Sequence, residues 1–172
     1  LREKPSSGGR TLYDEMNRRG ERKVLLNGCI DMKRFTGTDG IEKVAVTLTY
    51  KVAAEIGSLG DNVRFLREEI QKDEILKTLL HFERISHTIS SHTRWASVGA
   101  INEANCHPVD NISTDAISDT EGIIHVCLNG DIDNYLTLKD EFQKNGGTIP
   151  SDITTDTKII PLRIAHYYRQ NQ

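Results

Sequence analysis

Apolar residues recur every three to four positions in several stretches of the chain, the spacing of one helix face. The predicted helices cover residues 11–18, 21–35, 61–71, 73–80 and 134–144, and a last helix follows residue 157. In residues 21–35 the apolar side includes Leu25, Cys29 and Met32. Asp61 is predicted to cap the helix that starts there.

Other stretches are rich in β-branched and small residues, a composition that favours strands. They cover residues 43–52, 84–92 and 123–128. Gly99 and Gly130 lie where the second and third of them give way to loops. The mixture of helices and strands predicts the α+β class, with helices packed on an antiparallel sheet.

Length and composition narrow the class of protein further. The chain has 172 residues, enough for one domain with a hydrophobic core. Its formal net charge of -3 gives no general attraction to nucleic acid or to an anionic membrane. No apolar run reaches the length of a membrane span, and no signal-peptide pattern opens the chain. The three cysteines are too widely and oddly spaced for a disulfide framework, so a cytoplasmic protein is predicted.

The two ends of the sequence predict an incomplete chain. It begins at Leu1 without an initiator methionine and closes at Gln172, within a predicted helix. We therefore expect a processed chain or a fragment of a longer protein.

Four short motifs lie where predicted elements end, and chain turns of this kind often carry function. They are Arg94-Trp95, Asn105-Cys106-His107-Pro108, Leu128-Asn129-Gly130-Asp131 and Thr154-Thr155-Asp156-Thr157. Arg94 either stacks on the Trp95 indole at the surface or presents its planar fork to a carboxylate.

Asn129-Gly130 and Asp156 also have two interpretations each. Asn-Gly is a frequent turn pair because both residues tolerate left-handed backbone. The functional alternative is an oxyanion hole made by the Asn129 amide and the Gly130 N–H. Asp156 either opposes the helix dipole from the first turn or binds a cationic amine. Local sequence leaves these alternatives open.

Taken together, the motifs resemble the class II glutamine amidotransferases in order and approximate spacing. The matching residues are His92-Thr93-Arg94-Trp95-Ala96, Asn105-Cys106-His107-Pro108, Asn129-Gly130 with Asn134-Tyr135 and Leu138, and Thr154 with Asp156-Thr157. The tryptophan and the Thr-Asp-Thr ending are most similar to the glutaminase domain of the glucosamine-6-phosphate synthase type. The resemblance is clear over residues 86–164 and weak before them.

The resemblance implies an N-terminal-nucleophile hydrolase fold, a four-layer αββα sandwich that this chain would contain incompletely at both ends. Residues 1–172 would be a single partial glutaminase domain without the sugar-phosphate isomerase domains. The implied activity is hydrolysis of L-glutamine to glutamate and ammonia for transfer to a sugar phosphate such as fructose 6-phosphate, a step of amino sugar biosynthesis. The resemblance implies no cofactor and no metal, and a homodimer is left open.

Carried over position by position, the resemblance assigns a glutamine site. Arg94 would bind the α-carboxylate, and Asp156 would take the α-ammonium group. Asn129 and Gly130 would form the oxyanion hole. The chemistry agrees with these roles, because an amino acid carries two opposite charges and its amide carbon needs an anion-stabilising pocket.

The resemblance also implies a loop at residues 95–99, with Trp95 and Ser97, that closes over the substrate. His107 would lie in the surrounding shell. The nucleophile of the family is a cysteine at the mature N-terminus, which uses its own α-amino group as base. Leu1 stands in that place here.

None of the three cysteines is predicted to replace that nucleophile. Cys29 and Cys127 lie among apolar residues and are predicted to be inert core thiols. Cys106 and His107 are adjacent in an extended segment, so their side chains are predicted to point apart. The chain alone is therefore predicted to be inactive.

Three alternatives accompany this hypothesis. The chain could be an inactive glutamine-binding or regulatory module, or a different class II amidotransferase that resembles amidophosphoribosyltransferase. A third alternative is a zinc protein, although its ligand set has no recognised spacing. That set is His87, His92, Cys106, His107 and His125.

Overall fold

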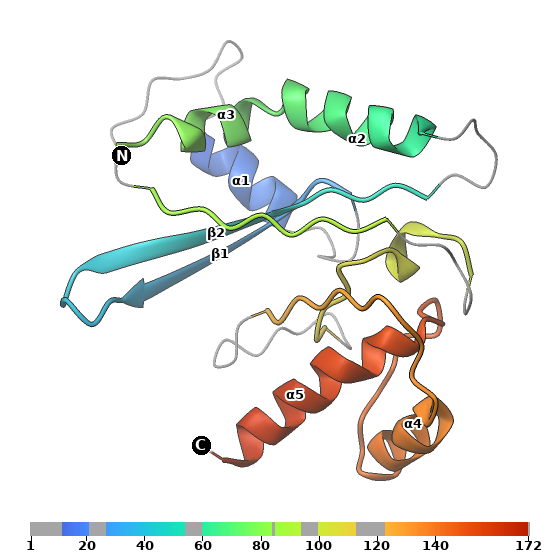
Figure 1. The fold of residues 1–172 in the computed structure, drawn as a ribbon. Helices are drawn as coiled ribbons and strands as arrows, with labels where there is room; N and C mark the ends of the chain where they lie inside the picture. The colour runs from blue at the N-terminus through green and yellow to red at the C-terminus, as the bar shows by residue number, and fades with distance from the viewer. Residues whose placement is uncertain are drawn as a thin grey trace. The chain divides into compact units, whose positions relative to one another are not determined.

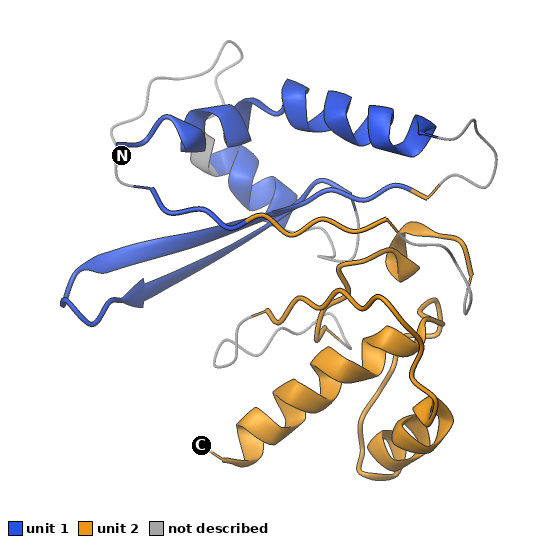
Figure 2. Cartoon of the chain, viewed as in Figure 1, with its two compact units in different colours: residues 1–52, 57–88 blue, residues 53–56, 89–172 orange. Residues whose placement is uncertain are grey.

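The structure is a computed structural model that describes residues 12–20, 27–53, 60–83, 85–93, 100–112 and 123–171. The chain folds into two compact units, shown in Figure 2. Unit 1 contains residues 1–52 and 57–88, and unit 2 contains residues 53–56 and 89–172. Within the described ranges, none of the helices combines the length and the hydropathy that a bilayer crossing requires.

Unit 1 is built on an antiparallel hairpin (Figure 1). Its elements are α1 (Leu12–Gly20), β1 (Cys29–Thr36), β2 (Glu42–Thr49), α2 (Asp61–Lys72) and α3 (Glu74–Leu80). The two strands join at a turn in which the Gly40 N–H donates to the Gly37 carbonyl at 2.9 Å. Gly40 has a φ of +72°, a conformation that glycine adopts without steric cost.

One face of the hairpin is apolar because side chains alternate between the two faces of a strand. That face packs against α1 and α3, and it forms the core of unit 1. The core consists of Met16, Ile30 and Ile75, with Met32, Val46, Leu48 and Leu79 packed against them. Each fully buried aliphatic side chain of this kind stabilises the fold by about 1.5–3 kcal/mol.

The predicted helix over residues 21–35 is wrong from Cys29 onward, because that segment forms strand β1. Ile30 and Met32 face the core while Asp31 lies between them, so the apolar residues here follow the period of a strand. Cys29 is 1% exposed, which confirms the predicted core thiol, but it lies on a strand. Residues 21–26 lie outside the described ranges.

The other local predictions in unit 1 are largely confirmed. The predicted helices 11–18, 61–71 and 73–80 correspond to α1, α2 and α3, and the predicted strand 43–52 corresponds to β2. Asp61 is not the cap of α2, because Gly60 occupies the N-cap position. Asp61 lies in the first turn, where its carboxylate pairs with Arg64 at 2.6 Å.

Unit 2 contains two α-helices and two short 3₁₀ helices in its described part. They are η1 (Glu103–Asn105), α4 (Tyr135–Lys144), η2 (Asp156–Lys158) and α5 (Ile159–Gln170). The predicted helix 134–144 is confirmed by α4, and the predicted last helix by α5. Phe142 packs against Ile159 and Leu162 in the core of this unit. A Cβ on Gly147 would come within 2.3 Å of the Phe142 ring, so the chain needs a glycine after α4.

The predicted strands 84–92 and 123–128 are wrong as sheet strands. Residues 85–92 contain no assigned strand, and residues 123–128 contain a single antiparallel bridge between Val126 and Val109. β-branched composition makes a segment suitable for pairing, but a strand also needs a neighbour with free backbone groups. Ile85 and Ile89 are accordingly exposed at the surface. Helices packed on an antiparallel hairpin still agree with the predicted α+β class.

Candidate functional site

Three of the four motifs converge in unit 2, and Asn105 joins the second motif to the fourth. Its side-chain oxygen accepts hydrogen bonds from the backbone N–H groups of Thr154, at 2.7 Å, and Thr155, at 2.9 Å. Its amide nitrogen donates to Asn102 Oδ1 at 2.7 Å and to the Asp152 carbonyl at 3.3 Å. Asn105 is 0% exposed, so this network fixes the turn before Asp156 without competition from water.

His107 connects the second motif to the third. The Leu128 N–H, just before Asn129-Gly130, donates to His107 Nδ1 at 3.4 Å. The imidazole is buried, and its ring lies 4.5 Å from the ring of His92, centroid to centroid. The predicted place of His107 in the shell of a glutamine site stays a prediction.

Asp156 connects the fourth motif to the third. This carboxylate is 5% exposed at the first position of η2. Its Oδ2 accepts from the Ile132 N–H at 2.7 Å, and its Oδ1 has longer hydroxyl contacts, 3.5 Å from Thr155 and 3.3 Å from Thr157. Burial, and then the Asp156 charge, raise the pKa of Tyr135. Asp156 therefore holds the segment after Asn129-Gly130, and its predicted role with an ammonium group is not tested.

Asn129 and Gly130 are both exposed at a bend after the Val109–Val126 bridge. Gly130 has a φ of +150°, where residues with a Cβ are rarely found, although space around it is open. The conformation accounts for glycine at the turn. The oxyanion-hole role of the pair stays a prediction.

A buried ion pair supports the same turn, and the sequence interpretation missed it. Lys158 is 0% exposed, and its Nζ lies 3.0 Å from Oδ1 of Asp110, which is also buried. The same Nζ donates to the carbonyls of Asp110, at 2.6 Å, and Ile112, at 2.7 Å. Burial lowers the pKa of Lys158, and the Asp110 charge opposes that shift. One signal was available: Lys158 precedes the buried Leu162 and Ala165 by four and seven positions, the spacing of one helix face.

Arg94, Trp95 and Ser97 lie outside the described residues, so their predicted roles are not tested. The residues on either side of them contact the motif cluster. The His92 ring meets the His107 ring, and the Ala100 N–H donates to Thr154 Oγ1 at 2.8 Å.

Comparison with known proteins gives one consistent set of relatives. No family model and no solved structure matches the chain. Curated proteins named glutamine–fructose-6-phosphate aminotransferase (isomerizing) do match. The protein of Aquifex aeolicus is 38% identical over 96 residues, which cover 56% of this chain and 14% of the relative. That of Pyrococcus horikoshii is 37% identical over 99 residues, covering 58% and 14%. That of Cyanidium caldarium is 34% identical over 145 residues, covering 84% and 20%.

The chain is similar to these aminotransferases. This similarity supports the predicted relationship to the glucosamine-6-phosphate synthase type. The matched region spans only 14–20% of the length of these relatives, so it concerns a minor part of each.

The three cysteines differ in burial. Cys29 is buried in β1, whereas Cys106 and Cys127 are partly buried in unit 2. Cys127 is therefore less enclosed than a core thiol, and its Sγ lies 3.5 Å from the Ser90 hydroxyl. In the part of the chain that the structure describes, the His, Cys, Asp and Glu residues form no group of three that could hold a metal ion.

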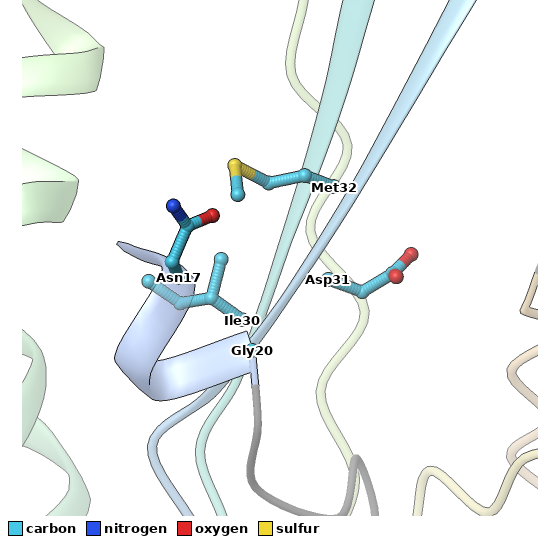
Figure 3. Close-up of a pocket in the computed structure, with 5 residues that line it drawn as sticks. All are labelled: Asn17, Gly20, Ile30, Asp31 and Met32. Carbon is cyan, nitrogen blue, oxygen red and sulfur yellow. The ribbon is translucent and has the colours of Figure 1, made fainter. Parts of the chain in front are cut away.

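Among the hollows of the described residues, two in unit 1 contain no predicted site residue. One of about 510 Å³ is lined by Asn17, Gly20, Ile30, Asp31 and Met32, and Figure 3 shows Asp31 pointing away from Asn17 and Met32. The other, of about 280 Å³, includes Arg19, Tyr50 and Asp73 in its wall. In this second hollow, Arg19 and Tyr50 both donate to Asp73, which indicates a structural role. The converging motifs of unit 2 therefore remain the candidate site.

Proposed function

We propose that the chain forms the glutamine-binding part of a class II glutamine amidotransferase. The whole protein would hydrolyse glutamine to glutamate and ammonia and transfer the ammonia to a sugar phosphate such as fructose 6-phosphate. The observation that carries the proposal is that hydrogen bonds accepted by His107, Asp156 and Asn105 join the motif segments across 21 to 50 positions of the chain. The names of the relatives, which include glutamine and fructose 6-phosphate, support the same function. The proposal includes the fold that the resemblance implies, a four-layer αββα sandwich in the complete domain.

Within this proposal, the two charges of glutamine have separate partners. Arg94 would bind the α-carboxylate through a two-pronged, charge-assisted contact. Asp156 would bind the α-ammonium through Oδ1, because Oδ2 is committed to the Ile132 N–H while Oδ1 has only the longer hydroxyl contacts. A buried carboxylate with remaining acceptor capacity is suited to a cationic group.

The amide end of glutamine would meet the Asn129 side chain and the Gly130 N–H, the pair proposed for the oxyanion hole. Trp95 and Ser97 would cover the bound substrate, and His107 would lie in the shell of residues around the site. We also propose that these 172 residues bind glutamine without hydrolysing it. This part of the proposal is supported by the burial of Cys29, whose thiol on β1 is shielded from solvent at 1% exposure.

Calorimetry with L-glutamine tests the binding role of Asp156. Asp156→Asn keeps an oxygen for the Ile132 N–H but removes the negative charge, so affinity is expected to fall by about tenfold to a hundredfold. Asp140→Asn is the matched control, since Asp140 is exposed on α4 in the same unit. Affinity should be unchanged in that variant, and circular dichroism should show both variants folded.

Two outcomes would contradict the proposal. One is an absence of glutamine binding to the unmodified chain. The other is an equal affinity in Asp156→Asn and the unmodified chain, which would leave Asp156 with a purely structural role. Repeating the titration with N-acetylglutamine, which has no ammonium group, should give weak binding that Asp156→Asn does not weaken further.

A further inference from the structure

The hydrogen bond between Leu128 and His107 fixes the protonation state of the histidine. A backbone N–H can only donate, so His107 Nδ1 must present its lone pair to Leu128. The ring proton then lies on Nε2, and the imidazole is neutral. The identity of the donor therefore defines one tautomer.

The same bond lies next to the proposed oxyanion hole. Val109 and Val126 exchange two backbone hydrogen bonds, at 3.0 and 2.8 Å, and these restrain the segment two residues earlier. Beyond them, the bond from the Leu128 N–H to His107 holds the residue directly before Asn129 and Gly130. Asn129 and Gly130 are therefore held on one side by the bond to His107 and on the other by the bond between Ile132 and Asp156.

We propose that His107 is a positioning residue that works as a pH-dependent latch. Neutral His107 holds the Leu128 N–H and with it the segment that carries Asn129 and Gly130. Protonation places a hydrogen on Nδ1, removes the acceptor and releases Leu128. The latch is a property of the ligand-free chain, whereas its effect on glutamine rests on the proposed function.

The groups around His107 favour release once a proton is added. The His92 ring, 4.5 Å away, is a second titratable group, and two imidazolium rings in contact would repel each other. The Asp110 carboxylate is paired with Lys158, and the Asp156 carboxylate accepts from Ile132.

Amide hydrogen exchange measured by NMR on the ligand-free chain tests the latch. Histidine titrates between about pH 5 and 8, so protection factors at those two limits are compared after correction for intrinsic exchange. The Leu128 amide should lose about five- to tenfold in protection at the lower pH, the worth of one hydrogen bond. The Val126 amide, bonded to the Val109 carbonyl, is the internal control and should not change.

Two variants separate protonation from other effects of acid. His107→Asn keeps an acceptor in the place of Nδ1 but does not titrate, so Leu128 should be protected equally at both pH values. His87→Asn replaces an exposed histidine of unit 1 and should behave as the unmodified chain. Constant protection in the unmodified chain, or a pH effect that persists in His107→Asn, would overturn the latch. If His107→Asn does not fold, the ¹⁵N shift of Nδ1 in the unmodified chain decides, because a protonated Nδ1 at neutral pH contradicts the assigned tautomer.

Calorimetry then tests the consequence for the site. Glutamine affinity should fall about five- to tenfold over the same pH interval in the unmodified chain and stay constant in His107→Asn. A chain that shows the exchange effect but binds no glutamine would refute the proposed function and leave the latch standing. A chain that binds glutamine but shows no exchange effect would refute the latch and leave the proposed function standing.

Discussion

Replacing Asp110 by asparagine is expected to lower the free energy of unfolding by about 3–5 kcal/mol. The substitution keeps the shape of the side chain but removes the negative charge beside Lys158, whose ammonium group is 0% exposed. A buried cation without its counter-ion cannot recover its lost hydration. Urea unfolding followed by circular dichroism measures the effect as a lower midpoint.

The matched control is Glu141→Gln, which makes the same chemical change in the same unit. Glu141 pairs with Arg163 at 3.0 Å, the separation found for Asp110 and Lys158, but its side chain is 53% exposed. Exposed ion pairs contribute about 0–1 kcal/mol, so this variant should remain near the unmodified chain. Equal losses in the two variants would show that burial does not determine the strength of these pairs.

A double variant separates the ion pair from the backbone contacts of the lysine. Lys158→Met combined with Asp110→Leu removes both buried charges, and such exchanges are often neutral or stabilising. Here Lys158 also bonds the carbonyls of Asp110 and Ile112, which would lose their donor. We therefore expect the double variant to recover only part of the loss caused by Asp110→Asn.

The helices were predictable from sequence because their signals are local. In α2, α4 and α5, apolar residues at helical spacing and nearby glycines or caps gave their positions to within a few residues. Strand β1 was missed because its apolar residues extend a preceding run that has helical spacing. The strand period can be distinguished from the helical period only by the pairing with β2, which joins eight residues of each strand.

The remaining strand predictions failed for a different reason. Residues 84–92 have the composition of a strand, but pairing requires a partner segment, and sequence composition contains no information about where that partner lies. Val126 pairs with Val109 in an isolated bridge, which does not extend into a strand pair.

The candidate site shows the same division between local and tertiary information. Motif order identified Asn129, Gly130 and Asp156, and the comparisons support the type of relative from which those roles were carried over. The contacts that join the motifs, such as Asn105 with Thr155, depend on tertiary packing that no local pattern encodes. The roles of the named residues in glutamine binding stay predictions.

In unit 1, replacing Asp73 by alanine is expected to lower the free energy of unfolding by about 3–4 kcal/mol, because one carboxylate bonds two helices and the Tyr50 hydroxyl. Its Oδ1 accepts from the N–H groups of Ile75 and Leu76 and so caps α3. Its Oδ2 lies 2.8 Å from Arg19 of α1 and accepts from the Tyr50 hydroxyl at 2.5 Å. Chemical denaturation measures the loss, and Asp73→Asn, which keeps the cap but not the charge, should lose less.

The pH dependence of this effect follows from the direction of the shift in the pKa of Asp73. Burial alone would raise the pKa of Asp73, but hydrogen bonds from Tyr50, Arg19 and the Leu76 amide outweigh it and hold the pKa below its ordinary value of 3.8. A carboxyl with a lowered folded-state pKa contributes stability above its ordinary value and loses it as the pH falls through the folded value. The difference between the unmodified chain and Asp73→Ala should therefore be constant near neutral pH and shrink in acid. Asp39→Ala removes an exposed carboxylate paired with Lys43 and should leave the unfolding midpoint in place.

Tyr50 of the same network should determine how the free energy of unfolding changes at alkaline pH. Burial, and then its hydrogen bond to Asp73 and the charge of that carboxylate, raise the pKa of Tyr50 above its ordinary value of 10.0. For an acid, a raised pKa means that the folded state favours the neutral hydroxyl, so its contribution is present below the ordinary value and is lost as the pH rises beyond it. Tyr50→Phe removes the titrating group, and its stability should fall less steeply in alkali than that of the unmodified chain. Parallel alkaline curves would mean that Tyr50 titrates equally in both states and that its bond to Asp73 does not persist in solution.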